Sequence, residues 1–134
     1  MPQENIELVR RGLDLVNRGD IEGALELFTE DFEMDWSNSI GPAKGIYRGR
    51  VQIRGFWDSF VEAFDALRWD PEEFIEVDES RLIVVNHVRM RGRGSGVEVE
   101  GMGAQLWTFR EGKAQSFKLY QSRAEALEAV GLSE

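Results

Sequence analysis

Residues 53–67, IRGFWDSFVEAFDAL, hold the densest block of large apolar side chains in the sequence. Their spacing of 3, 1, 3, 4 and 3 positions places these side chains on one face of a helix, and they are Ile53, Phe56, Trp57, Phe60, Phe64 and Leu67. A face this rich in aromatic rings has to be buried against a second layer of structure. The fold class therefore depends on what surrounds this helix.

Four strand-like segments follow the helix, at 68–77, 81–92, 97–110 and 113–121. The turns between them contain DES, RGSG and REGK, which are typical turn compositions. Strands joined by turns this short must run antiparallel.

Two helices are expected before the aromatic segment, over 6–16 and 21–28, followed by a strand in which Phe32, Met34 and Trp36 alternate with acidic residues. A loop at 37–49 is long enough to form the rim of a pocket. Ser122 and Glu125 have capping-box spacing and predict a final short helix that Gly131 ends. The order α-α-β-α-β-β-β-β-α indicates one α+β domain, 1–134, with its helices on one face of the sheet.

Composition narrows the function classes. The net charge is −9 and there is no cysteine, so we expect no nucleic-acid partner, no disulfide and a reducing, cytoplasmic location. No apolar run reads as a signal peptide or a membrane span. With one histidine and no cysteine we expect no metal site. Without GxGxxG or GxxxxGK[ST] we expect neither a dinucleotide-binding fold nor a P-loop, and we expect no cofactor.

Arg89, Arg91 and Arg93 alternate along one predicted strand, and His87 shares their parity. We interpret them as a solvated strand face, on which Glu98 and Glu100 of the next strand pair with the arginines. The alternatives for the arginines are nucleic-acid binding, an anionic ligand and a partner surface. His87 is interpreted as a surface or dimer-contact residue, with a catalytic base as the alternative.

Three segments carry a family resemblance: LVNRGDIEGALELFTEDFEMDW at 15–36, YRGRVQIRGFW at 47–57 and LWTFREGKAQSFKLY at 106–120. They resemble the NTF2-like superfamily and, within it, the SnoaL-like group that includes polyketide cyclases and ketosteroid isomerases. The resemblance implies a cone-shaped fold, with a curved antiparallel sheet wrapped around the long helix and a pocket inside. It also implies a homodimer that pairs through the sheet.

Ketosteroid isomerase chemistry needs an Asp base, a Tyr and a protonated Asp, and none of them is present at the matching positions. By the resemblance, the first-helix tyrosine falls on Gly12, the base on Trp36 and the protonated aspartate on Gln105, while a supporting tyrosine falls on Trp57. The sequence therefore leaves open whether the protein is an enzyme. The candidates for a catalytic role are Gln105 and Asp35, the latter only if its strand slips by one residue and turns Asp35 inward.

Strand parity predicts a mostly apolar pocket with a few polar groups, and the expected ligand-binding residues are Trp36, Trp57, Asn86, Gln105, Trp107, Phe117 and Gln121. The alternative is that the tryptophans fill a solid core. We therefore predict a protein that binds a small, largely apolar molecule, with isomerase, cyclase or hydrolase activity left open. The alternatives are a non-catalytic ligand-binding module and a homodimeric protein-interaction domain.

Overall fold

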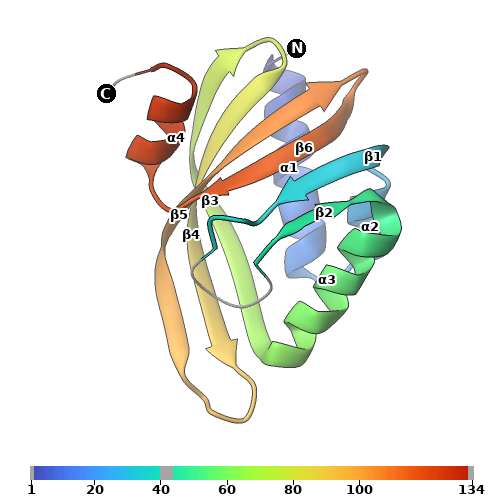
Figure 1. Ribbon diagram of the computed structural model, residues 1–134, viewed down its shortest axis with the longest axis vertical. Helices are drawn as coiled ribbons and strands as arrows, with labels where there is room; N and C mark the ends of the chain where they lie inside the picture. The colour runs from blue at the N-terminus through green and yellow to red at the C-terminus, as the bar shows by residue number, and fades with distance from the viewer. Residues whose placement is uncertain (1, 40–43, 133–134) are drawn as a thin grey trace.

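The computed structural model describes residues 2–39 and 44–132. It contains four helices and one six-stranded sheet (Figure 1). The helices are α1 (Pro2–Asn17), α2 (Ile21–Leu25), α3 (Gly49–Ala63) and α4 (Arg123–Ala129). The strands are β1 (Phe28–Asp35), β2 (Ile46–Arg48), β3 (Phe64–Asp78), β4 (Arg81–Gly92), β5 (Glu98–Arg110) and β6 (Lys113–Tyr120).

The sheet order is β2-β1-β6-β5-β4-β3. The three hairpins from β3 to β6 are antiparallel, as predicted, but β1 runs parallel to β6. The hairpin rule does not apply to this pair, because most of the chain separates the two strands. The α+β class is confirmed, with a mixed sheet in place of a purely antiparallel one.

The aromatic segment is helical only as far as Ala63, and Phe64 opens β3. The predicted extension of this helix to Leu67 is wrong. The misleading spacing arises in β3, whose register against β4 shifts between Phe64 and Ala66. A bulge of this kind lets two residues at an odd spacing face the same side of a sheet. Phe64 and Leu67 therefore both pack on the core, at a spacing that imitates a helix.

The short strand β2 lies within the predicted loop 37–49, and residues 40–43 of that loop are outside the described ranges. It pairs with β1 through Glu33, Met34 and Asp35. Three residues are too few to show strand periodicity, so the pattern did not reveal it. Likewise Phe28 opens β1 and does not end the second helix, which stops at Leu25.

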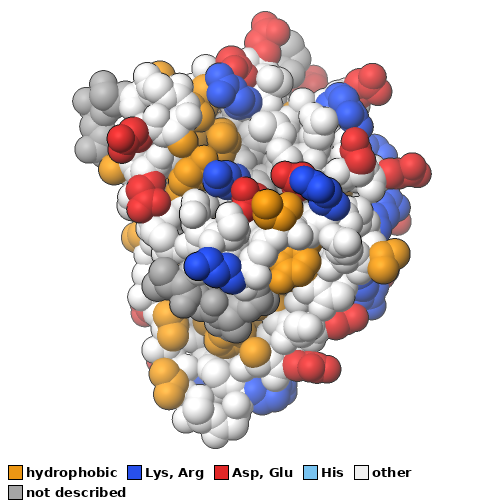
Figure 2. Space-filling model, in the orientation of Figure 1, with side chains coloured by type: hydrophobic (Ala, Val, Ile, Leu, Met, Phe, Trp, Pro, Cys, Tyr) orange, Lys and Arg blue, Asp and Glu red, His pale blue; other side chains and the backbone are white. Residues whose placement is uncertain are grey.

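The main core fills the space between the sheet and α1, α2 and α3. A second cluster lies on the opposite face of the sheet, where Ile83, Val85 and Ala104 pack against Ala126 and Leu127 of α4. Figure 2 shows apolar side chains gathered beside this helix. The expectation that all helices share one face is therefore wrong for α4. The described residues include no helix that is long and apolar enough to cross a membrane.

Candidate functional site

Four of the predicted pocket residues are aromatic, and all four are buried in the core of the cone: Trp36, Trp57, Trp107 and Phe117. The ring centroids of Trp107 and Phe117 are 5.0 Å apart, and those of Trp36 and Phe117 are 5.9 Å apart. Contacts at these distances are typical of packed aromatic cores. Trp36 and Trp107 therefore both pack against Phe117, and these three rings fill the inner part of the cone.

Asn86 and Gln105 form a polar group within this core, exposed by only 1% and 5%. Gln105 Oε1 accepts hydrogen bonds from Asn86 Nδ2 and Trp107 Nε1, both at 3.1 Å. Among the described residues, Asn86 Oδ1 and Trp36 Nε1 are buried without a hydrogen-bond partner. Buried polar atoms are almost always paired, so these two atoms are exceptions in the interior.

Gln121, the seventh predicted residue, lies apart from the other six. Its side chain donates to the carbonyl of Asn38, and it borders a hollow beside α4 together with Val85 and Met102. Val85 belongs to the cluster under α4. Gln121 is therefore on the outer side of the sheet.

Asp35 also faces away from the core. Met34 and Trp36, its neighbours in the sequence, are buried on the core side, as the alternation of apolar and acidic residues in β1 predicted. Its carboxylate accepts from the Ser37 hydroxyl and backbone N–H and lies 3.8 Å from Lys118 Nζ. Burial raises the pKa of Asp35, but the Ser37 hydrogen bonds and Lys118 outweigh it and leave this pKa below its usual value. The structure thus separates Asp35 from Gln105 and holds it as an anion.

Replacing Asp35 by asparagine is expected to lower the free energy of unfolding by about 1 kcal/mol near neutral pH. Since its folded pKa is depressed, Asp35 stabilises the fold above the unfolded pKa of about 4, and this contribution disappears as the pH falls through the folded value. Urea unfolding at neutral and acidic pH measures the effect. If the difference in the free energy of unfolding between wild type and variant grew at acidic pH, this prediction would be wrong.

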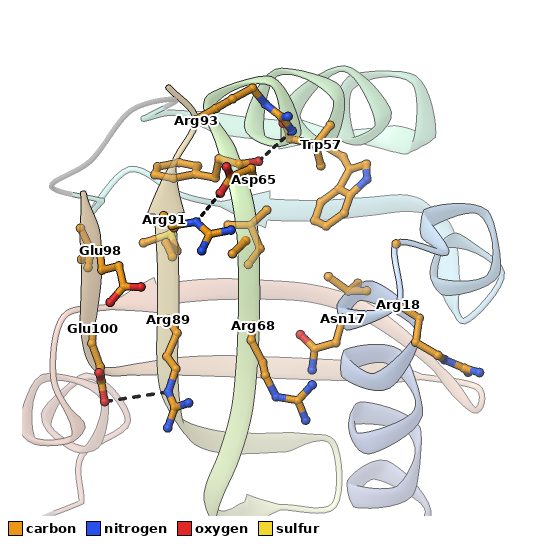
Figure 3. A pocket seen from close by; sticks show the side chains of 18 residues that line it. Asn17, Arg18, Trp57, Asp65, Arg68, Arg89, Arg91, Arg93, Glu98 and Glu100 are labelled. Carbon is orange, nitrogen blue, oxygen red and sulfur yellow. Dashed lines mark hydrogen bonds and ion pairs between the residues drawn. The ribbon is translucent and has the colours of Figure 1, made fainter. Parts of the chain in front are cut away.

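A cavity of about 720 Å³ lies where the C-terminal end of α1, the middle of α3 and the first residues of β3 meet the β4–β5 hairpin (Figure 3). α3, β3 and β4 give most of its apolar wall, with Trp57, Val61, Phe64, Leu67 and Met90, and Val16 of α1 and Val99 of β5 complete it. Of the seven predicted ligand-binding residues, only Trp57 lines it. We call this cavity the mouth of the cone.

Asn17 fixes one side of the mouth. Its side-chain amide donates to the carbonyl of Trp69 and accepts from the Trp69 N–H, both at 2.9 Å, as a neighbouring strand would. β3 is the edge strand of the sheet, so this pair of bonds satisfies edge groups that would otherwise be free. α1 is thereby held against β3 at the entrance to the cone.

Sequence reasoning did not find the mouth. The alternating arginines and the acidic residues facing them were visible, but they were interpreted as a solvated face. Their predicted pairing is present, since Arg89 lies 3.9 Å from Glu100, although Arg91 pairs at 2.8 Å with Asp65. Within the described part of the chain, no group of three or more His, Cys, Asp or Glu side chains is placed to hold a metal ion.

The curved sheet and its helices define an NTF2-like fold, as solved structures show. An NTF2-like protein of unknown function from Burkholderia pseudomallei superposes with a TM-score of 0.77 at 23% identity, covering 96% of this chain and 98% of that one. TerC, co-crystallised with polyporic acid, gives 0.79 at 24% identity, over 95% and 98% of the two chains. A putative polyketide cyclase from Xanthomonas campestris gives 0.72 at 19% identity, over 96% and 98%.

A model of the SnoaL-like domain matches residues 9–117, and the chain belongs to this family. The resemblance seen in the sequence is thereby confirmed. No curated protein is similar enough in sequence to be counted as a relative.

Proposed function

We propose that the protein binds a small molecule with a largely apolar body in the mouth of the cone. The observation that carries the proposal is the apolar wall, to which α3, β3 and β4 each contribute side chains around one cavity of about 720 Å³. Cavities of about 300–1,000 Å³ with apolar walls and a few polar groups are typical small-molecule sites. TerC, which has the same fold, was co-crystallised with a small molecule, polyporic acid.

The buried predicted residues are proposed as the inner wall behind this cavity. Val88 and Asn86 continue the inward face of β4 beyond Met90, and a strand rises about 3.3 Å per residue. Asn86 therefore lies about 13 Å further along β4 than Met90, and Gln105 stands opposite Val84, two residues beyond Asn86.

Neither candidate for acid–base catalysis that the sequence offered lines this cavity. A general base has to lie within hydrogen-bond reach of the proton that it removes. Asp35 faces away from the cone and is held as an anion by Ser37 and Lys118. Gln105 is inside, but an amide does not transfer protons.

Filling the mouth tests the proposal. Ala66 is exposed and lines the cavity, so Ala66→Trp adds an indole there without opening the core. We expect this variant to bind the uncharged fluorescent probe N-phenylnaphthylamine at least tenfold more weakly than the wild type, measured by titration. Far-UV circular dichroism and the urea midpoint check that the fold is retained.

Ala63→Trp is the matched control. Ala63 is also exposed, but it lines a separate hollow beside α3, with Tyr47 and Phe56. This variant is expected to bind the probe within twofold of wild type. If Ala63→Trp weakens binding and Ala66→Trp does not, the ligand occupies the other hollow and the proposal is wrong.

A further inference from the structure

Besides the edges formed by β2 and β3, the sheet has a further free edge along part of β5. β5 runs from Glu98 to Arg110, but β6 pairs with it only between Ala104 and Arg110. Residues 98–103 therefore have β4 on one side and no strand of the described chain on the other. Figure 1 shows this part of β5 along the lower left border of the molecule, below α4. We call residues 98–103 the open edge.

The backbone of the open edge directs hydrogen-bonding groups toward solvent. At the turn between β4 and β5, the Gly92 N–H donates to the carbonyl of Val97 at 2.9 Å, and the same register continues along both strands. Bonded and non-bonded pairs alternate in an antiparallel ladder, so the odd-numbered residues of the open edge bond to β4. The N–H and C=O groups of Glu98, Glu100 and Met102 therefore point away from β4, where the described chain has no strand to receive them.

The other edges of the sheet are protected against the addition of a strand. β2 is only three residues long. β3 contains Pro71 and three shifts of register, and the Asn17 side chain occupies its edge groups at Trp69. Short strands, proline, bulges and covering groups all keep an edge from pairing with another chain. The open edge has no proline and a continuous register against β4, so it remains able to pair.

Exposed apolar side chains gather at the open edge and at the residue before it. Val97, Val99 and Met102 are exposed by 61%, 50% and 49%. They make up half of the six large apolar side chains that are exposed in the described ranges. Apolar groups gathered at one place on a protein surface are typical of an interaction site.

β4 shows which side chains suit a strand beside the open edge. Its residues 88–91 are Val-Arg-Met-Arg and lie opposite residues 98–101. Val88 and Met90 pack against the core, and the two arginines alternate with them and extend from the outer face, next to the glutamates of β5. Opposite charges at facing positions stabilise a strand pair. A second strand of this composition therefore suits the other side of the same glutamates.

β4 leaves acidic charge at the open edge without full compensation. Glu100 is 60% exposed and lies closest to His87, at 2.7 Å, which is charged only when protonated. Arg91 stands opposite Glu98 but pairs with Asp65, at 2.8 Å. Among the described residues, no basic side chain forms an ion pair with the Glu98 carboxylate. Basic side chains of an added strand can therefore pair with both glutamates.

We propose that the open edge binds an extended segment of a partner protein in which basic and apolar side chains alternate. The segment adds to the sheet as an antiparallel strand. Its basic side chains lie beside Glu98 and Glu100 on the outer face, and its apolar side chains lie beside Val99 on the inner face. A second copy of the chain fits less well, because its open edge brings further glutamates to the same place. This inference does not depend on the ligand of the mouth.

Three synthetic peptides test the proposal. The first is acetyl-VRMRVR-amide, which extends the pattern of residues 88–91. Facing residues of an antiparallel pair share one face of the sheet, so the arginines beside the glutamates are the residues whose N–H groups bond to the open edge. N-methylation of the three arginines is expected to weaken binding about tenfold, because it removes these donors and keeps the charges. N-methylation of the two valines and the methionine blocks only the far side of the strand and is expected to leave binding within about twofold. Fluorescence anisotropy of labelled peptides measures all three.

Met102→Pro tests the open edge from the side of the protein. Proline removes an N–H that points away from β4, so the ladder between β4 and β5 is retained. This variant is expected to bind the unmodified peptide about tenfold more weakly than the wild type. Met102→Ala, the matched control, keeps the N–H and is expected to bind within about threefold. Far-UV circular dichroism and the urea midpoint check that both variants are folded.

Several outcomes would overturn the proposal. One is that the unmodified peptide does not bind with saturation. Another is that the peptide methylated on its arginines binds equally well, because general attraction between a basic peptide and an acidic protein then explains binding. If Met102→Pro binds as the wild type does, the open edge is not the site, and if this variant does not fold, the methylated peptides still decide on the wild type. A dimer in light scattering that Met102→Pro dissociates would show that a second copy occupies the edge, and the proposed partner would be wrong.

Discussion

Replacing Phe32 by alanine is expected to lower the free energy of unfolding by about 3–5 kcal/mol, the usual cost of removing a buried phenyl ring. Phe32 is 1% exposed and stacks on Phe28 with ring centroids 4.0 Å apart. The rings of Trp107 and Phe117 lie 6.3 and 6.2 Å away. A domain is stable by only about 5–15 kcal/mol, so urea unfolding should show a large shift of the midpoint.

The control for this variant is Val51→Ala on α3. Val51 is 87% exposed, and a substitution at such a position changes stability by no more than about 0.5 kcal/mol. A cost near 1 kcal/mol for Phe32→Ala would contradict the packing described above. It would mean that the inner part of the cone is already open around this ring.

Replacing Asn86 by aspartate is expected to cost about 3–5 kcal/mol at neutral pH, because it places a carboxylate without a counter-charge in the core. The new carboxylate would face Gln105 Oε1, which now accepts a hydrogen bond from Asn86 Nδ2 at 3.1 Å. Burial raises the pKa of such a group. The folded state therefore binds the proton more tightly than the unfolded chain does, and the destabilisation grows as the pH rises above about 4. Urea unfolding at acidic and neutral pH measures this dependence.

Asn86→Leu is the companion variant, of similar size and without polar atoms. It gives up one hydrogen bond, but it removes the oxygen that has no partner in the described part of the chain. Leaving such an atom buried costs about 1–3 kcal/mol, so we expect Asn86→Leu to be at least as stable as the wild type. If Asn86→Asp is tolerated at neutral pH, water reaches Asn86 and the interior is not closed.

Most of the fold was predictable because burial follows the side-chain periodicity. The alternation of Phe32, Met34 and Trp36 gave the correct face of β1, and the parity of β4 placed Asn86 inside. The end of α3 was not predictable, because the bulge in β3 gives Phe64 and Leu67 a helical spacing. The pairing of β1 with β6 joins segments that are distant in the sequence, and no local pattern records it.

The candidate site was predictable in part, because strand periodicity also shows which side chains face the core. Parity identified the inward residues, but it does not show whether inward side chains leave space between them. The mouth depends on three non-local arrangements: the register that sets Leu67 against Met90, the bonds from Asn17 to Trp69, and the position of α3 over β3. A homodimer through the sheet stays a prediction, which light scattering at micromolar concentration decides.

The central claim is that ligand binds at the mouth, against Trp57, and not in the packed interior. The chain has four tryptophans, and each indole N–H gives its own resonance in a nitrogen-15 correlation spectrum. On titration with anilinonaphthalene sulfonate, we predict that the Trp57 indole and the backbone amides of 64–68 shift, while the indoles of Trp36 and Trp107 stay in place. Shifts at Trp36 and Trp107 with Trp57 unmoved would contradict the account and place the ligand inside the cone.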